Sequence, residues 1–400
     1  MRRRELLHLM ACAVPACTAA GRVFAAPPGS PRFLLVFLRG GYDCANILIP
    51  YSSAYYYETR PNIAVRRPTG QDTGGALALD SDWALAPALR SSVALLYAQR
   101  QALFIPFAGT EDLSRSHFET QDDIELGQAA SGRVQGSPDL RSGFMARLAG
   151  VVNGAAPIAF TDSLPVCFRG SADIPNISLK GVGRLVFDAR QAAILSAMYT
   201  GHHLQPQVED GLELRQEVSR AMEQEMKEAS RDALTPKGFE LEARRVGRLM
   251  RDQYRIGFID VGGWDTHVNE GSAQGALANN IDSLGKGLTA LSQELGAEWR
   301  NTVVAVVSEF GRTFRENGNK GTDHGHGSVY WILGGSINGG RVAGEQTGVT
   351  RENLFQDRDY PVLNEYRAVL GGLFAALWGL SPEQVQQVFP ASTPVDLKVI

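Results

Sequence analysis

Aspartate and histidine side chains occur together in two glycine-flanked segments of this chain. Residues 323–326 read Asp-His-Gly-His between two glycines, and residues 265–267 read Asp-Thr-His directly after Gly-Gly-Trp. Carboxylate oxygens and imidazole nitrogens are the ligands that Zn, Mn and similar ions take in proteins. The chain has only 7 histidines, so placing three of them beside aspartates favours a metal site. The alternative is that each Asp-His pair only orders its own loop.

These residues follow strands that the sequence predicts. Asp43 comes after a first apolar run, the pair Ser116-His117 after a second, Asp265 and His267 after a third, and residues 323–326 after a fourth. In an open parallel α/β sheet, the loops beyond the carboxyl ends of the strands converge on one crevice. We therefore expect four distant segments to form one site, with enough ligands for two ions.

The elements that must hold this site alternate along the chain. Short apolar runs bounded by glycine or charge predict buried parallel strands at 33–38, 102–107, 255–260, 302–307 and 329–333. Apolar residues at three-to-four spacing predict helices at 85–99, 212–234, 238–250, 276–295 and 364–378. This order predicts a three-layer, doubly wound α/β fold, with a mostly parallel sheet and helices on both faces.

The amino terminus has the features of an export signal. Arg3 and Arg4 begin a twin-arginine pattern, and residues 23–25 (Val-Phe-Ala) give a small-residue cleavage pattern. We expect residues 1–25 to be a signal peptide, removed so that the mature chain begins near Ala26. A Sec signal is an alternative reading of the same basic start, and Cys17 gives a weaker lipoprotein-like one. The predicted location is periplasmic or extracellular.

Composition limits the other classes of function. Removal of residues 1–25 takes away four arginines and one glutamate, so the formal charge moves from -4 to about -7. No basic tract indicates nucleic acid binding, and no later apolar stretch is long enough to cross a bilayer. Cys44 and Cys167 remain, which allows at most one disulfide. We expect residues 26–400 to form one domain, with a cap insertion at about 134–206.

Several sequence blocks together resemble a bacterial family of exported proteins. The blocks lie at 37–43, 116–118, 262–267 (Gly-Gly-Trp-Asp-Thr-His), 308–313 (Ser-Glu-Phe-Gly-Arg-Thr) and 321–325 (Gly-Thr-Asp-His-Gly). The chain resembles the domain of unknown function 1501 family, whose members are often exported by the twin-arginine route. The resemblance implies membership in the alkaline phosphatase and sulfatase-like superfamily, and hence an alkaline phosphatase-like fold.

The superfamily pattern implies roles for particular residues. It assigns Ser116 as a nucleophile that bridges the metal site. The implied ligands of one or two divalent ions, most simply Zn or Mn, are Asp43, Asp265, His267, Asp323, His324 and His326. The chain departs from the pattern in the short spacing between Asp265 and His267, and in having no histidine after His326. The resemblance therefore allows a one-metal site, or one completed by water or Glu309.

Four further residues are candidates for catalysis, each with a structural alternative. Ser116 is equally well placed to attack a substrate or to cap the helix that follows it. His117 can orient a substrate oxyanion or simply cover the loop. Glu309 and Arg312 follow a strong apolar strand, where a buried ion pair is as good an interpretation as support of the site or anion binding.

The sequence thus predicts an exported, metal-dependent hydrolase of phosphate or sulfate esters, acting through Ser116 or through water at the metal. The substrate is a small-molecule or polymer-borne ester. The alternative is a non-catalytic exported binding or assembly protein that keeps the fold and a metal. A companion exported protein is a partner that the resemblance implies for either function.

Overall fold

A seven-stranded mixed sheet forms the centre of the protein in the computed structural model, which describes residues 29–69, 74–128, 141–170, 174–179, 189–210, 212 and 239–400. The strand order is β10-β5-β9-β8-β1-β7-β6. All neighbouring strands run parallel except β9, which is antiparallel to both β5 and β8. The strands are β1 (Arg32–Leu38), β5 (Ala102–Gly109), β6 (Pro157–Phe160), β7 (Ile256–Val261), β8 (Thr302–Ser308), β9 (Ser328–Gly334) and β10 (Asn364–Glu365).

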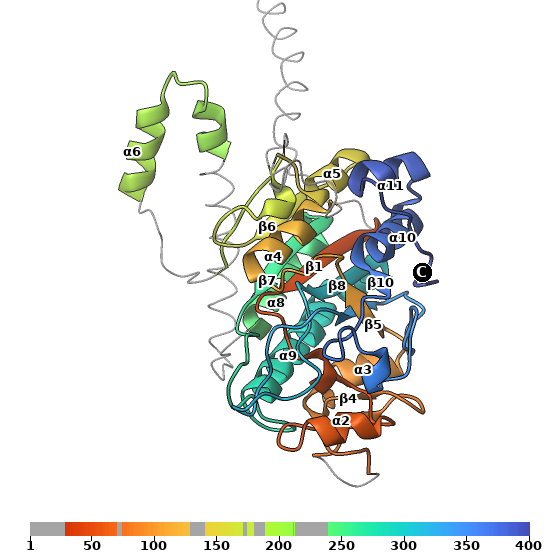
Figure 1. Cartoon of the computed structure of the whole chain (residues 1–400). Helices are drawn as coiled ribbons and strands as arrows, with labels where there is room; N and C mark the ends of the chain where they lie inside the picture. The colour runs from red at the N-terminus through yellow and green to blue at the C-terminus, as the bar shows by residue number, and fades with distance from the viewer. Residues whose placement is uncertain are drawn as a thin grey trace, which may run out of the picture.

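Helices cover both faces of this sheet (Figure 1). Alternate residues of β1 show why: Leu34 and Val36 belong to one apolar core, and Phe33 and Leu35 to another. The first core takes its helical residues from α3 (Val93–Ala98), α8 (Phe239–Asp252) and α9 (Ala276–Leu295). The second takes them from α4 (His117–Leu126), α5 (Phe144–Val151), α10 (Tyr366–Trp378) and α11 (Pro382–Val388). The predicted three-layer α/β fold with a mostly parallel sheet is confirmed.

Smaller elements complete the described chain. A second, antiparallel sheet has the order β2-β4-β3 and consists of β2 (Leu48–Ile49), β3 (Leu77–Ala78) and β4 (Ala84–Leu85). Further helices include α2 (Ala54–Thr59) and α6 (Ala189–Tyr199). None of the helices in the described ranges is long and apolar enough to cross a membrane.

Three sequence expectations differ from the structure in detail. The strand predicted at 329–333 is antiparallel, because the chain returns from β8 to β9 through a loop without the helical crossover that parallel pairing needs. The helix predicted at 85–99 is reduced to α3, because Pro87 begins a separate short turn after β4. The helix predicted from 364 begins at Tyr366, where Glu365 caps it by accepting from two backbone N–H groups.

Other predicted segments lie partly outside the described residues. The signal peptide and nearly all of the helix predicted at 212–234 fall there. Within the segment predicted as a cap, α5 and β6 lie in the body of the fold, because β6 pairs with β7 at the edge of the sheet. Cys44 and Cys167 are buried free thiols, and they belong to the cores on opposite sides of the sheet, so they do not pair.

The antiparallel direction of β9 has a consequence for the site. The end of β8 and the beginning of β9 lie at the same edge of the sheet, which is also the carboxyl edge of β1, β5 and β7. Residues 309–327 therefore form a loop over that edge, together with the loops that follow the other three strands. The topology brings the four predicted segments to one side of the molecule.

Candidate metal centre

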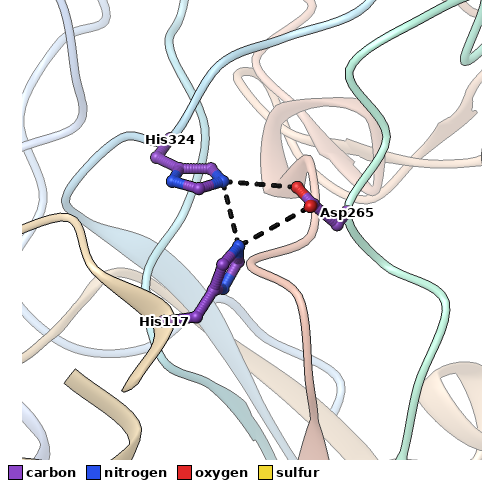
Figure 2. Close-up of side chains that lie close together, drawn as sticks. All are labelled: His117, Asp265 and His324. Atoms are coloured by element: carbon purple, nitrogen blue, oxygen red, sulfur yellow. Dashed lines mark hydrogen bonds and ion pairs between the residues drawn. The ribbon is translucent and has the colours of Figure 1, made fainter. Parts of the chain in front are cut away.

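Side chains from three of these loops converge on one point (Figure 2). His117 is the first residue of α4, Asp265 follows β7, and His324 lies between β8 and β9. One ligand atom from each of the three lies within 4.8 Å of the other two, as a metal site requires. His267 joins them from the same loop as Asp265, with its Nε2 2.9 Å from Asp265 Oδ1.

His324 and Asp265 are shared by two overlapping groups of three. His324 Nε2 lies 2.9 Å from His117 Nε2 and 3.1 Å from His267 Nε2. The same atom is 3.3 Å from Asp265 Oδ1. His117 Nε2 is 3.7 Å from Asp265 Oδ2. Three imidazole nitrogens and one carboxylate therefore face one another.

In His117 and His324, Nε2 faces the cluster and Nδ1 faces away from it. The hydrogen-bond partner of each Nδ1 indicates where the ring proton lies. His324 Nδ1 lies 3.1 Å from the carbonyl oxygen of Arg115, which can only accept a hydrogen bond, so Nδ1 carries the proton. His117 Nδ1 lies 2.8 Å from Oε1 of the Glu309 carboxylate and donates to it. In a neutral imidazole the other nitrogen is then an acceptor. When both imidazoles are neutral, their Nε2 lone pairs face each other across 2.9 Å, an arrangement that a shared cation would stabilise.

This arrangement fits a divalent cation. Metal-binding histidines characteristically donate their second N–H to a carboxylate or backbone carbonyl, and His117 and His324 do so through Glu309 and Arg115. A tetrahedral zinc with bonds of about 2.0–2.1 Å separates its ligand atoms by about 3.3 Å. The observed separations of 2.9 to 3.7 Å bracket that value. Imidazole nitrogens with one carboxylate suit zinc and similar transition-metal ions.

The surroundings of His324 and Asp265 shift the pKa of each group toward the protonation state that binds a metal ion. Burial lowers the pKa of His324, and the charges of His117 and Arg312 lower it further. Burial alone would raise the pKa of Asp265, but a hydrogen bond and the charge of Arg312, with His267 and His117, lower it overall. Near neutral pH, His324 is therefore neutral and Asp265 is ionised, as metal binding requires.

Arg312 is a fully buried connector between the loops. Its guanidinium donates to Asp265 and to the backbone oxygens of Gly40, Gly41 and Thr322, and its Nη1 lies 3.4 Å from His267 Nε2. The structure thus places Arg312, a predicted catalytic residue, as an ion-pair partner that holds Asp265 in position.

Glu309 lies behind His117 and has no exposed side-chain surface. Its Oε1 accepts from His117 Nδ1, the backbone N–H of Gly40 and the amide of Gln121, each at 2.8 Å, and Ser308 donates to Oε2. Burial would raise the pKa of Glu309, but these hydrogen bonds lower it overall, so the group is a carboxylate. Its position is that of a residue that orients His117.

Ser116 occupies the N-cap position of α4, but its side chain makes no cap hydrogen bond. Its backbone N–H is held by Ser114 Oγ, and the preceding residue, Arg115, has a positive φ of 52°. Because His117 follows directly, the hydroxyl group lies one residue from a metal-facing imidazole. The cap alternative therefore has no support from side-chain hydrogen bonding.

Three predicted ligands lie elsewhere. Asp43 is buried and ion-paired with Arg60, at 2.5 and 3.0 Å. Asp323 lies behind His267, with Oδ1 3.4 Å from His267 Nδ1. His326 is buried, with its ring centroid 5.0 Å from that of Phe355. The structure thus does not bring Asp43 or His326 to the cluster, and it places Asp323 where it can accept from a ligand.

Sequence reasoning missed other residues that build the centre. Asp359 is fully buried and accepts from Arg115 and from Arg358 at 2.7 and 3.0 Å. Arg358 also donates to the backbone oxygen of His324 at 2.9 Å, so Asp359 fixes both segments that hold this imidazole. These contacts depend on tertiary pairing, and no local pattern signals them. The signal available for His117 was its place in the segment that follows a predicted strand, where the next helix begins.

The position of His326 predicts a pH dependence of stability. Burial lowers its pKa to about 4, and the charge of Arg115 adds to this effect. The unfolded chain takes up the proton near pH 6.5 and the folded chain only near pH 4, so stability is lost as pH falls between these values. In metal-free protein the loss from His326 should be on the order of 3 kcal/mol.

This prediction is tested by denaturant unfolding of chelator-treated protein between pH 7 and pH 4. His326→Gln cannot titrate in this range, while the other groups titrate in both proteins. The difference in unfolding free energy between the wild type and the variant should therefore shrink as the pH falls. Parallel pH profiles would show that His326 does not stay neutral in the folded protein.

Comparisons with known proteins agree with the sequence resemblance. A family model described as protein of unknown function (DUF1501) matches residues 30–389. The search of curated proteins found no significant match.

Among solved structures, three similar ones share little sequence with the chain. The lipoteichoic acid synthase LtaP from Listeria monocytogenes is 8% identical, with a TM-score of 0.41 over 95% of this chain and 78% of its own. The 2-O GAG sulfatase BT1596 is 11% identical, with a TM-score of 0.40 over 92% and 73%. A protein of the alkaline phosphatase superfamily from Vibrio parahaemolyticus is 12% identical, with a TM-score of 0.37 over 80% and 64%. At these TM-scores the likeness assigns no activity to the chain.

Proposed function

This chain belongs to the DUF1501 family, and we propose that it is an exported, metal-dependent hydrolase of phosphate or sulfate esters with an alkaline phosphatase-like site. The observation that carries the proposal is the pair of facing Nε2 atoms of His117 and His324, 2.9 Å apart beside Asp265. Three ligand atoms within 4.8 Å of one another, open to solvent at Asp265, are the arrangement of a catalytic rather than a closed structural metal site.

The residues of the chain have distinct parts in this function. His117, His324 and Asp265 would hold the cation, with His267 beside them. A divalent ion there supplies a Lewis acid that polarises an ester oxygen and neutralises its charge. Glu309 orients His117, and Arg312 keeps Asp265 ionised. The Ser116 hydroxyl lies one residue before His117. The other adjacent hydroxyl, that of Thr266, is buried and donates to Glu270.

A panel of phosphate and sulfate esters, assayed with and without added Zn or Mn, tests the proposed hydrolysis. We expect turnover that chelation abolishes and metal restores. If Ser116 attacks the ester, Ser116→Ala should lower turnover by several orders of magnitude while metal content stays unchanged, because only the attacking atom is lost. If water attacks instead, the same variant should keep activity close to normal.

One observation favours the alternative of a metal-containing binding or assembly protein. His117 is not placed as a base for Ser116, because its Nδ1 is bonded to Glu309 and its Nε2 faces His324. Within the described ranges, no hydrogen bond joins the Ser116 hydroxyl to a base. A protein that binds metal stoichiometrically but turns over no ester of the panel would support this alternative, with a companion exported protein as its partner.

Export by the twin-arginine route is part of the proposal. The support is the Arg3-Arg4 pair with the cleavage pattern before Ala26. Replacing both arginines with lysine keeps the positive charge but removes the pair that the twin-arginine receptor reads. We expect the precursor to accumulate in the cytoplasm, measured by cell fractionation. Continued export of this variant would instead indicate the Sec route.

A further inference from the structure

The candidate metal centre is open to solvent. The side chains of Asp265 and His267 are 47% and 39% exposed, so a ligand can reach the cluster from outside. The charged groups at this opening already have partners: Asp265 is paired with Arg312, and Asp323 accepts from Asn317 at 3.1 Å. The polar side chains around the cluster are thus largely engaged with one another.

Large apolar side chains stand beside two of the metal-facing histidines. Phe118 follows His117 and is 85% exposed, and Val268 follows His267 and is 57% exposed. Consecutive Cα atoms are 3.8 Å apart, and both histidines lie within 3.1 Å of His324 Nε2. Phe118 and Val268 are therefore attached to the backbone directly beside two metal-facing histidines, and we call these two residues the apolar rim.

The fold does not account for the apolar rim. The apolar residues that α4 contributes to the interior are Ile124 and Leu126, at the other end of the helix. Phe118 is the most exposed large apolar residue of the described chain, although a serine or glutamate at this first turn would serve helix formation at least as well. An exposed apolar group at the edge of a polar site is characteristic of ligand recognition.

We infer that the centre takes an anionic ester whose organic group is apolar, such as an aryl or branched-alkyl group, and that this group packs on Phe118 and Val268. The inference rests on the proposed function for the anionic part of the ligand. The cation and the histidines receive the anion, and the apolar rim covers the organic group. A sugar ester would instead need exposed donors and acceptors where Phe118 and Val268 stand.

The inference is tested by comparing two non-hydrolysable anions, phenylphosphonate and methylphosphonate, on the holo-protein as purified. Their dissociation constants are measured by calorimetry. Burying the phenyl group on the apolar rim should make phenylphosphonate bind about tenfold more tightly than methylphosphonate. In Phe118→Ser and in Val268→Ser this ratio should fall to about threefold or less, with metal content equal to that of the wild type.

Leu95→Ser is the matched control. Leu95 is 54% exposed on α3, which ends shortly before β5 begins and so lies at the opposite edge of the sheet from the centre. This variant should keep the wild-type ratio. A ratio near one in the wild type, a ratio unchanged in both rim variants, or no binding of either phosphonate to protein with its full metal would each overturn the inference.

The outcomes separate this inference from the proposed hydrolysis. If the phenyl preference depends on Phe118 and Val268 but no ester is turned over, the ligand class stands and the hydrolase function fails. If esters are turned over but the two phosphonates bind equally, the hydrolase function stands and the apolar ligand fails. Ester turnover with equal binding of the two phosphonates is also the result expected if Phe118 and Val268 contact a macromolecule instead of the substrate.

Discussion

Replacing His324 with alanine is expected to abolish divalent metal binding by the mature protein. His324 Nε2 is the atom common to both groups of possible ligands, at 2.9 Å from His117 and 3.1 Å from His267. Loss of an outer residue that orients a ligand weakens metal binding by about 10- to 100-fold, so loss of the ligand itself should exceed about 100-fold. Elemental analysis after gel filtration measures the effect, and the wild type should retain one or two ions.

His326→Ala is the matched control, because it removes an imidazole two residues away that packs beside Phe355. It should keep its metal. Adding Zn should raise the melting temperature of the wild type but not of His324→Ala. Metal retained in His324→Ala would overturn the assigned centre, and metal lost in His326→Ala would show that His326 is a ligand, as the family resemblance implies.

The position of the site was predictable from the sequence because it depends on topology rather than on contacts. Short apolar runs such as residues 33–38 and 302–307 favour buried strands, and the carboxyl ends of parallel strands meet at one edge. Any loop that follows such a strand is brought to the same place. Thus His117, Asp265 and His324 are adjacent, although the first and last are 207 positions apart.

The roles of individual residues were not predictable in the same way. Whether a carboxylate faces a cation or an arginine depends on which side chain reaches it in the folded chain. Asp43 meets Arg60, which the chain supplies 17 residues later. The proton position on His324 depends on a backbone oxygen, that of Arg115, and Asp359 determines where that backbone lies. The direction of β9 depends on the loop between β8 and β9, which contains no helix. The apolar pattern of a strand does not indicate in which direction the strand runs.

Replacing Arg60 with methionine is expected to have the largest effect on stability, about 3–5 kcal/mol of unfolding free energy. The Arg60 guanidinium is fully buried and is the ion-pair partner of Asp43, whose side chain is also buried. Removing it leaves a carboxylate without a counter-charge in an apolar interior. Glu270 lies close by. Burial raises the pKa of Glu270 well above its usual range, and the negative charge of Asp43 raises it further, so this second carboxyl group stays protonated. Denaturant unfolding at neutral pH measures the loss.

Two further variants separate the ion pair from the metal centre. Arg351→Met removes an exposed arginine, 64% exposed and 3.7 Å from Asp357, and should change stability by less than about 1 kcal/mol. Asp43→Asn in the Arg60→Met background removes the unpaired charge, so it should recover part of the lost stability. The Asp43→Asn single variant should keep its full metal content, because Arg60 and not a metal ion is the partner of Asp43. Loss of metal from that variant would mean that Asp43 turns from Arg60 to the cation, and that the site has a second ion.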